Sequence, residues 1–319
     1  MRKILAFNKM TDPLTYENER LLSIPGVEIV KSSATTEEEM IKDAKDAEVI
    51  LFTSAAFPKN VIEGLESCKV IQRYGIGYDT VDTAAAKEKG IFVCNSPNYG
   101  VVDVAEHAFS LILACLKRLV KMNDRVRDNN WGFENMGKSN RLSGKTVGFL
   151  GFGKIARAVA GFTLPFGTKN LVYDPYVSAE ALAPFGAEAV SLERLFKESD
   201  IITVHLPLSD ATRHTVGVAE LSLMKPSAIL VNTSRGPVID EAALVDALVN
   251  GTIGGAGLDV FEDEEGGIDK RILSLDNVVL TPHVAWNTAE AVDAIHTEVT
   301  ENIVKYLTEG RPDNIVNGL

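Results

Sequence analysis

Short apolar runs alternate with polar, helix-like stretches along the first third of the chain. The runs lie at residues 3–7, 27–30, 48–54, 69–75 and 91–95 and are rich in β-branched and aromatic side chains. Apolar runs of this length predict strands, and strands that alternate with helices form parallel sheets. The pattern therefore predicts four βα units and a closing strand.

The next segment, residues 101–120, has helical periodicity. Its apolar positions recur every three or four residues and lie at Ala105, Phe109, Ile112, Leu113, Leu116 and Val120. This spacing predicts one long amphipathic helix with a wide apolar face. We expect this helix to connect two domains.

The alternation of strands and helices resumes after a polar stretch at 127–140. Seven apolar runs predict strands at 145–151, 170–174, 187–191, 200–206, 228–234, 254–260 and 278–282. A last helical pattern at 287–310 is expected to return to the first domain. The chain is therefore expected to be an α/β protein with two doubly wound parallel sheets.

Composition narrows the classes of function. The 319 residues carry 44 acidic and 32 basic side chains, and the net charge of -12 disfavours a nucleic-acid partner. The three cysteines form no CxxC pair, so neither a disulfide framework nor a metal site is expected, and a cytoplasmic location is favoured. No apolar run has the length of a signal peptide or a membrane span, so we expect no membrane partner.

A glycine motif lies in "VGFLGFGKIARAVA" (147–160), between a predicted strand and a predicted helix. Gly151 and Gly153 permit a tight turn and a close approach of the backbone to a pyrophosphate, and the small Ala156 lets the helix pack on the strand. Asp174, about 20 residues further on, is placed to accept hydrogen bonds from an adenosine ribose. Because "DPYVSAE" contains no Arg or Lys, the motif predicts NAD rather than NADP. A glycine turn without a ligand is the alternative.

Three chemically active side-chain types follow neighbouring predicted strands in the second half of the chain. Arg235 ends "LVNTSR", a carboxylate cluster with Glu262, Glu264 and Glu265 follows "GLDV", and His283 follows "VVLTP". Ligands of doubly wound sheets bind at the carboxyl ends of strands, so these groups indicate a hydride-transfer site. A surface arginine and a structural histidine are the alternatives, and composition does not choose among the three glutamates.

Longer stretches of the sequence resemble the NAD-dependent D-isomer-specific 2-hydroxyacid dehydrogenases. They are "GFGKIA", "SDIITVHLPLSDATRHTVG", "MKPSAILVNTSRGPVID", "GLDVFEDE" and "TPHVA", in the order and at the spacing of that family. The resemblance implies that Arg235, Glu264 and His283 are the catalytic residues. His283 would then exchange a proton with the substrate, Glu264 would favour the imidazolium, and Arg235 would bind a 2-oxo acid.

The resemblance also implies binding residues. Backbone amides of Tyr74, Gly75, Ile76 and Gly77 would receive the substrate carboxylate in the cleft between the domains, and Trp286 would lie near the pocket. For the glycines a simple turn, and for Trp286 a core or interface position, are the alternatives. Residues expected to bind NAD are Gly151, Gly153, Lys154, Ile155, Asp174, His205, Pro207, Thr212, Thr233, Ser234, Asp259 and His283. Asp259 matches the residue that bonds the nicotinamide carboxamide, and for His205 a packed strand residue is an equal alternative.

The family fold implies a flavodoxin-like substrate-binding domain, split between 1–98 and 287–319, and an NAD-binding Rossmann domain at 99–286. It also implies a homodimer formed through the cofactor domain.

The resemblance leaves several substrates open. "HVAW" favours hydroxypyruvate or glyoxylate, and D-3-phosphoglycerate is the alternative, although its dehydrogenases typically carry a basic residue where Thr53 lies. Formate dehydrogenases carry a different residue at the position of Glu264, and phosphite dehydrogenases at the position of Ile76, so the sequence disfavours both activities. An NADH-sensing transcriptional corepressor is the alternative of another class, and the chain lacks the low-complexity tail such proteins use to recruit partners.

Overall fold

The computed structural model describes residues 1–7, 14–132, 134, 137–264 and 266–319. The chain separates into two compact units, the first formed by 1–100 and 288–319 and the second by 101–287. These boundaries lie within two residues of those expected from the sequence. Among the described residues, no helix is both long and apolar enough to cross a membrane.

The first unit is built around a five-stranded sheet in the order β2-β1-β3-β4-β5. All strand pairs in it are parallel, which confirms the four βα units and the closing strand. Its elements are β1 (Arg2–Phe7), α1 (Thr15–Leu21), β2 (Val27–Ser32), α2 (Glu37–Ala44), β3 (Val49–Phe52), α3 (Lys59–Gly64), β4 (Val70–Arg73), α4 (Thr83–Glu88), β5 (Phe92–Cys94) and α12 (Ala289–Glu309).

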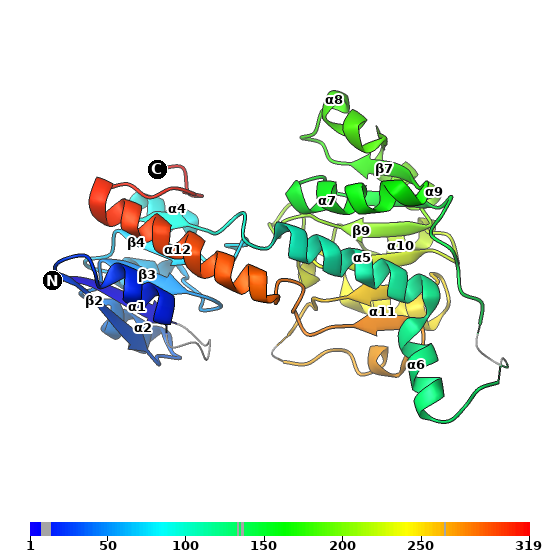
Figure 1. Ribbon diagram of the computed structural model, residues 1–319, viewed down its shortest axis with the longest axis horizontal. Helices are drawn as coiled ribbons and strands as arrows, with labels where there is room; N and C mark the ends of the chain where they lie inside the picture. Colours follow the sequence, from blue (N-terminus) through cyan, green and yellow to red (C-terminus); the bar gives the residue numbers. More distant parts are fainter. Residues whose placement is uncertain (8–13, 133, 135–136, 265) are drawn as a thin grey trace. The chain divides into compact units, whose positions relative to one another are not determined.

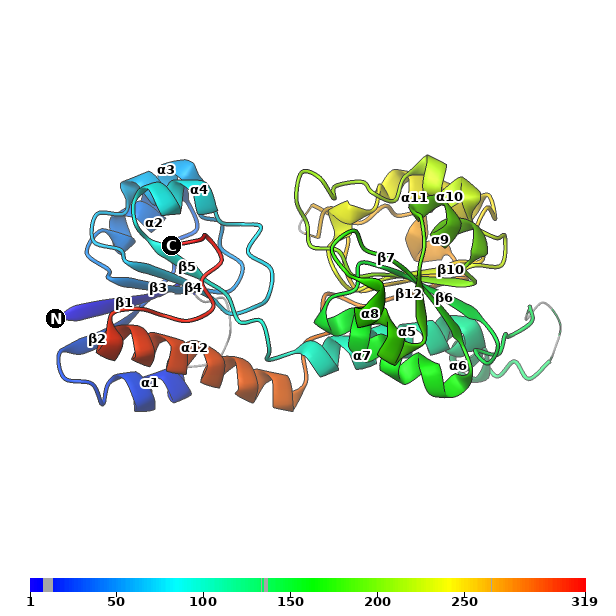
Figure 2. The same cartoon turned by 90° about the horizontal axis from the view of Figure 1, so that it is seen from above.

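Helices cover both faces of this sheet. One core lies between the sheet and helices α2, α3 and α4, and the other between the sheet and helices α1 and α12. Figure 2 shows the two helical layers on opposite sides of the strands. The last helix therefore returns to the first domain, as predicted.

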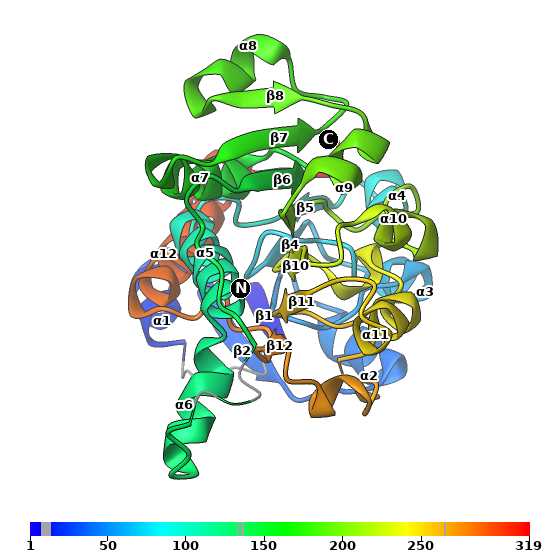
Figure 3. The same ribbon diagram turned by 90° about the vertical axis from the view of Figure 1, so that its right-hand side faces the viewer.

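The second unit contains a seven-stranded parallel sheet in the order β12-β11-β10-β9-β6-β7-β8. Figure 3 labels β8, β7, β6, β10, β11 and β12 of this sheet in that order. Its strands are β6 (Thr146–Leu150), β7 (Lys169–Tyr173), β8 (Ala187–Ala189), β9 (Ile201–Val204), β10 (Ile229–Asn232), β11 (Gly255–Leu258) and β12 (Val278–Leu280). All seven predicted strands are confirmed.

The helices of the second unit also form two layers. Helices α5 and α7 cover one face, and α9, α10 and α11 cover the other (Figures 1 and 2). The helices are α5 (Val101–Lys117), α6 (Leu119–Arg127), α7 (Lys154–Thr163), α8 (Ala179–Leu182), α9 (Leu192–Glu198), α10 (Val218–Leu223) and α11 (Glu241–Val249), and short 3-10 turns lie at 164–166, 183–185, 236–238 and 272–274.

The prediction of one helix over 101–120 was wrong at its end. Arg118 adopts a left-handed conformation with φ 53°, so α5 ends at Lys117 and α6 begins at Leu119. The Asn140 amide donates to the Leu116 carbonyl and helps to satisfy the end of α5. The apolar face of α5 up to Leu116 is buried within the unit, whereas Leu119 and Val120 are exposed.

Candidate active site

The predicted catalytic residues follow three neighbouring strands of the second unit. Arg235 follows β10, Glu264 follows β11 and His283 follows β12. Since these strands are parallel and paired side by side, their carboxyl ends lie at the same edge of the sheet. The glycine motif follows β6 at that edge, next to the point where the strand order changes direction.

The backbone around Arg235 is fixed by a tight contact with the segment after β11. A Cβ atom at Gly236 would lie 1.8 Å from the carbonyl oxygen of Phe261, so only glycine fits here. The Asn232 side chain donates to the Arg235 carbonyl over 2.9 Å and accepts from the Ser234 amide over 2.9 Å. Arg235 is thereby held extended beside the segment that carries Glu264.

The glutamate cluster after β11 separates into different roles. Glu264 Oε2 lies 2.8 Å from His283 Nδ1, whereas Glu262 bonds His214 Nε2 at 2.6 Å and the Glu241 amide. Glu265 lies outside the described residues. The structure therefore pairs Glu264 with the imidazole of His283.

The Glu264–His283 pair is partly open to solvent, with side-chain exposures of 38% and 40%. Burial raises the pKa of Glu264, but the hydrogen bond and charge of His283 outweigh it and hold that pKa below its usual range. The carboxylate therefore remains ionised where an imidazole titrates. The pair commits Nδ1 of His283 to Glu264, and Nε2 has no hydrogen-bond partner within the described part of the chain.

Asp259 lies beneath the segment that carries His283. Its carboxylate is 1% exposed and accepts the Val284 and Ala285 amides over 2.9 Å each. Its main-chain carbonyl accepts the His283 amide over 2.8 Å. Trp286 packs behind the same segment, because its indole nitrogen donates to the His283 carbonyl over 3.1 Å. The predicted cofactor contact of Asp259 and substrate contact of Trp286 stay predictions.

The glycine motif has the shape that a pyrophosphate requires. Gly151 has φ 86°, and a Cβ there would lie 2.9 Å from the His205 carbonyl oxygen. Gly153 has open space where a Cβ would stand, and it begins α7 without a side-chain cap. The amides at the start of α7, at Lys154 and Ile155, therefore face a position suited to an anion.

Asp174 follows β7 and lies beside the glycine motif. Its two carboxylate oxygens accept the amides of Phe152 over 2.8 Å and Tyr176 over 2.9 Å. These bonds fix the carboxylate close to the glycine turn, where it retains lone pairs for ribose hydroxyls.

The remaining residues predicted to bind the cofactor follow β9 and β10. Burial lowers the pKa of His205 to about 3, and its ring stacks on Phe149, which favours the packed, neutral alternative. Thr212 donates to the Pro207 carbonyl over 2.6 Å. Thr233 Oγ1 is buried and has no hydrogen-bond partner among the described residues. This unsatisfied hydroxyl and the open space at Gly153 fit a dinucleotide.

Tyr74 directly follows β4 in the first unit. Its amide donates to the Phe52 carbonyl over 2.8 Å, so this amide is already used in the fold. Its phenol donates to the buried Glu17 over 2.6 Å, and His296 bonds the same oxygen atom over 2.6 Å. These two hydrogen bonds outweigh burial and lower the pKa of Glu17.

The three carbonyl groups of the loop at 75–77 accept hydrogen bonds from other residues of the first unit. They accept, in chain order, from the Ser96 amide over 2.9 Å, the Asn95 side chain over 2.7 Å and the Arg73 guanidinium. The three amides of this loop have no acceptor among the residues that the structure describes. A run of such amides forms a site for an anion.

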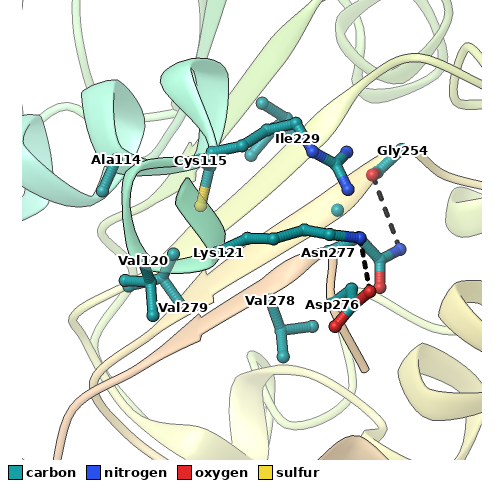
Figure 4. A pocket seen from close by; sticks show the side chains of 12 residues that line it. Ala114, Cys115, Val120, Lys121, Ile229, Gly254, Asp276, Asn277, Val278 and Val279 are labelled. Atoms are coloured by element: carbon teal, nitrogen blue, oxygen red, sulfur yellow. Dashed lines mark hydrogen bonds and ion pairs between the residues drawn. The ribbon is translucent and has the colours of Figure 1, made fainter. Parts of the chain in front are cut away.

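A small cavity of about 30 Å³ lies elsewhere, between α5, α6 and β12. Figure 4 shows Cys115 at its wall and Lys121 paired with Asp276. Burial raises the pKa of the Cys115 thiol to about 12, so the thiol is unreactive. The cavity has room for water but not for a substrate.

His107 is a residue near the candidate active site that the sequence analysis missed. It lies on α5, and its Nε2 is 3.0 Å from Thr281 Oγ1, next to the segment that carries His283. No motif contains it, and a histidine on an amphipathic helix gives no signal of such a contact.

Known proteins share this sequence and architecture. Residues 109–285 match the family described as D-isomer specific 2-hydroxyacid dehydrogenase, NAD binding domain. The hydroxypyruvate reductase of Thermotoga maritima is 40% identical over 93% of this chain and 97% of its own. The D-3-phosphoglycerate dehydrogenase of Methanocaldococcus jannaschii is 40% identical over 97% of this chain, which spans only 59% of that protein.

A solved structure has the same fold. The D-lactate dehydrogenase of Aquifex aeolicus, in complex with NAD and lactic acid, superposes with a TM-score of 0.88 and 32% identity and covers 99% of both chains.

Proposed function

Because the chain belongs to the NAD-dependent D-isomer specific 2-hydroxyacid dehydrogenases, we propose that it reduces a small 2-oxo acid at the edge formed by β10, β11 and β12. We further propose hydroxypyruvate or glyoxylate as the substrate. The observation that supports the site most directly is the 2.8 Å bond between Glu264 and His283, which follow β11 and β12, while Arg235 follows β10 beside β11. In this proposal the enzyme is an oxidoreductase that acts on the CH–OH group of D-2-hydroxy acids and uses NAD.

His283 is the proposed acid and base. With Nδ1 bonded to Glu264, its Nε2 is the atom that would donate a proton to the ketone oxygen during reduction. In the reverse direction the neutral imidazole would take the hydroxyl proton through the same atom. The ionised Glu264 favours the imidazolium and fixes the orientation of the ring.

Arg235 is the proposed electrophile and substrate anchor. Its guanidinium can bond both the carboxylate and the carbonyl oxygen of a 2-oxo acid, and it would stabilise negative charge that develops on that oxygen. The contact of Gly236 with Phe261 supports this role, because it fixes where the Arg235 backbone lies.

The loop at 75–77 is the proposed second anchor for the substrate carboxylate. Its carbonyls are bound to Ser96, Asn95 and Arg73, which leaves its amides for an anion. Tyr74 would contribute through the position of the loop rather than through its amide, which donates to Phe52.

The cofactor residues support NADH rather than NADPH. When bound, NADH supplies the hydride for the substrate carbonyl carbon. The α7 amino terminus and Gly153 would hold the pyrophosphate, and Asp174 would hold the adenosine ribose. A phosphate on that ribose would meet the like charge of Asp174.

A small, uncharged substrate tail is favoured over a phosphorylated one. Thr53 supplies no charge, and the nearby Arg73 donates to the carbonyls of Thr53 and Gly77. D-3-Phosphoglycerate remains the alternative because of the relative in Methanocaldococcus jannaschii. A corepressor would bind NADH without turnover.

A cytoplasmic location is proposed from the cysteines. Cys68, Cys94 and Cys115 are all free thiols, as expected for a reducing compartment. Recovery of the protein in a secreted or periplasmic fraction would contradict it.

The direct test of the function is a set of kcat/KM values for small 2-oxo acids. We expect hydroxypyruvate and glyoxylate to exceed 3-phosphohydroxypyruvate, and NADH to exceed NADPH. Oxidation of D-glycerate but not L-glycerate would establish the stereochemistry. NADH binding with no turnover of any 2-oxo acid would favour the corepressor, and equal rates with both cofactors would contradict the role of Asp174.

Replacement of His283 and replacement of Arg235 should change kcat and KM in different ways. His283→Ala should lower kcat roughly 10²–10⁴-fold, because the proton donor is lost, while NADH binding is retained. Arg235→Ala should raise KM and lower kcat together, since one guanidinium holds both the ground state and the transition state. Steady-state kinetics and NADH fluorescence titration measure both effects. A His283→Ala variant as fast as the parent at every pH would exclude this site.

The pH profile should depend on Glu264. Reduction requires the imidazolium, which the Glu264 charge stabilises, so Glu264→Gln makes the proton easier to lose. The pH above which reduction declines should therefore move downward. Glu262→Gln, which alters a neighbouring carboxylate that bonds His214, is the matched control and should leave the profile in place. An unchanged profile in Glu264→Gln would contradict the proposed pairing.

We propose a homodimer formed through the second unit. Exposed apolar side chains gather on and after α6, at Leu119, Val120, Val126 and Trp131, with Trp131 73% exposed. Trp131→Asp should shift the mass in sedimentation velocity toward one chain, whereas Tyr176→Asp, at another exposed aromatic residue, should not. A single-chain mass for the parent at micromolar concentration would contradict the dimer.

A further inference from the structure

A chain of hydrogen bonds connects helix α5 to the segment that carries His283. The Thr281 hydroxyl donates to Asp259 Oδ1 over 2.6 Å, so its oxygen is left to accept a bond from His107 Nε2 over 3.0 Å. His107 Nε2 also lies 3.6 Å from Asp259 Oδ1. The imidazole of His107 therefore holds the Thr281 hydroxyl in the orientation in which it donates to Asp259.

Asp259, the last residue in this series of hydrogen bonds, holds the backbone on both sides of His283. Asp259 accepts the His283 amide with its carbonyl and the Val284 and Ala285 amides with its carboxylate. His283 itself has φ 54°, a left-handed conformation that residues with a side chain rarely adopt. Such a conformation persists only where the surroundings determine it, and here Asp259 supplies three of the bonds that do so.

His107 lies where it can fix this arrangement. Helix α5 packs across β10, β11 and β12, and the backbone of the helix sets the distance of His107 from the loop. The His107 side chain is 23% exposed and the Asp259 side chain 1% exposed, so the contact is largely screened from water. A change at His107 would thus be transmitted to the His283 backbone through Thr281 and Asp259.

We propose that His107 is a positioning residue for His283 and acts through Thr281 and Asp259. This inference rests on the proposed function, in which His283 exchanges the substrate proton. His107 does not replace that proton donor. It holds the main-chain conformation that directs the imidazole of His283 toward the reacting oxygen, where a displacement of about 1 Å costs up to 10²-fold in rate.

The test compares His107→Ala and Thr281→Val with two matched variants. Thr281→Ser keeps the hydroxyl that links His107 to Asp259. His214→Ala removes another partly exposed imidazole of the same unit, which bonds Glu262 and makes no contact with Thr281. For each variant, kcat and KM for hydroxypyruvate, the Kd for NADH and the thermal midpoint are measured.

We expect kcat to fall roughly 10- to 100-fold in His107→Ala and Thr281→Val, with a much smaller change in the Kd for NADH. Thr281→Ser and His214→Ala should stay near the parent. A lowered thermal midpoint identifies a variant that loses activity through unfolding. If His107→Ala or Thr281→Val unfolds, the other of these two variants decides the test.

A double variant tests whether His107 acts through His283. If it does, His107→Ala should cause no further loss of kcat once His283→Ala is present. Losses that multiply in the double variant, or a parent-like kcat in His107→Ala and Thr281→Val, would overturn this inference alone. A His283→Ala variant as active as the parent would instead overturn the proposed function, and this inference with it.

Discussion

Parallel strand pairing is the constraint on which the rest of the structure depends. It brings residues that are 29 and 19 positions apart along the chain to one edge of a sheet, because β10, β11 and β12 end there side by side. No single segment carries the proposed chemistry. Each strand delivers one group, and the helices between strands return the chain to the opposite edge. The 29 positions from Arg235 to Glu264 include helix α11, whereas the 19 from Glu264 to His283 include only the short 3-10 turn at 272–274.

The sequence predicted those parts of the fold that depend on local pattern. Strands such as β6 and β10 are short apolar runs, and a fully buried parallel strand needs no more than that. The end of α5 was not predictable, because arginine is a good helix former and the local pattern gives no sign of the left-handed conformation of Arg118. Helix patterning gives which face is apolar, not where a helix stops.

The site shows the same division between local and distant causes. The glycine motif could be recognised from the sequence because it lies between a strand and a helix and because Gly151 has a positive φ, 86°, which glycine adopts readily. The choice of Glu264 from its neighbours depended on His283, which belongs to a different strand. His107 gave no signal at all, since its partner Thr281 lies 174 residues away in the chain. Side chains that position others are recognised only from their contacts.

The anion site proposed for the 75–77 loop consists of main-chain amides, and this has an evolutionary consequence. An amide is present whatever side chain the residue carries, so substitution cannot delete it unless proline is introduced. If the loop binds the substrate as proposed, the side chain of Ile76 can vary and alter which substrate tail is accepted, while recognition of a carboxylate is inherited unchanged. Such a division between a fixed and a variable part allows a lineage to acquire new substrates without losing its chemical class.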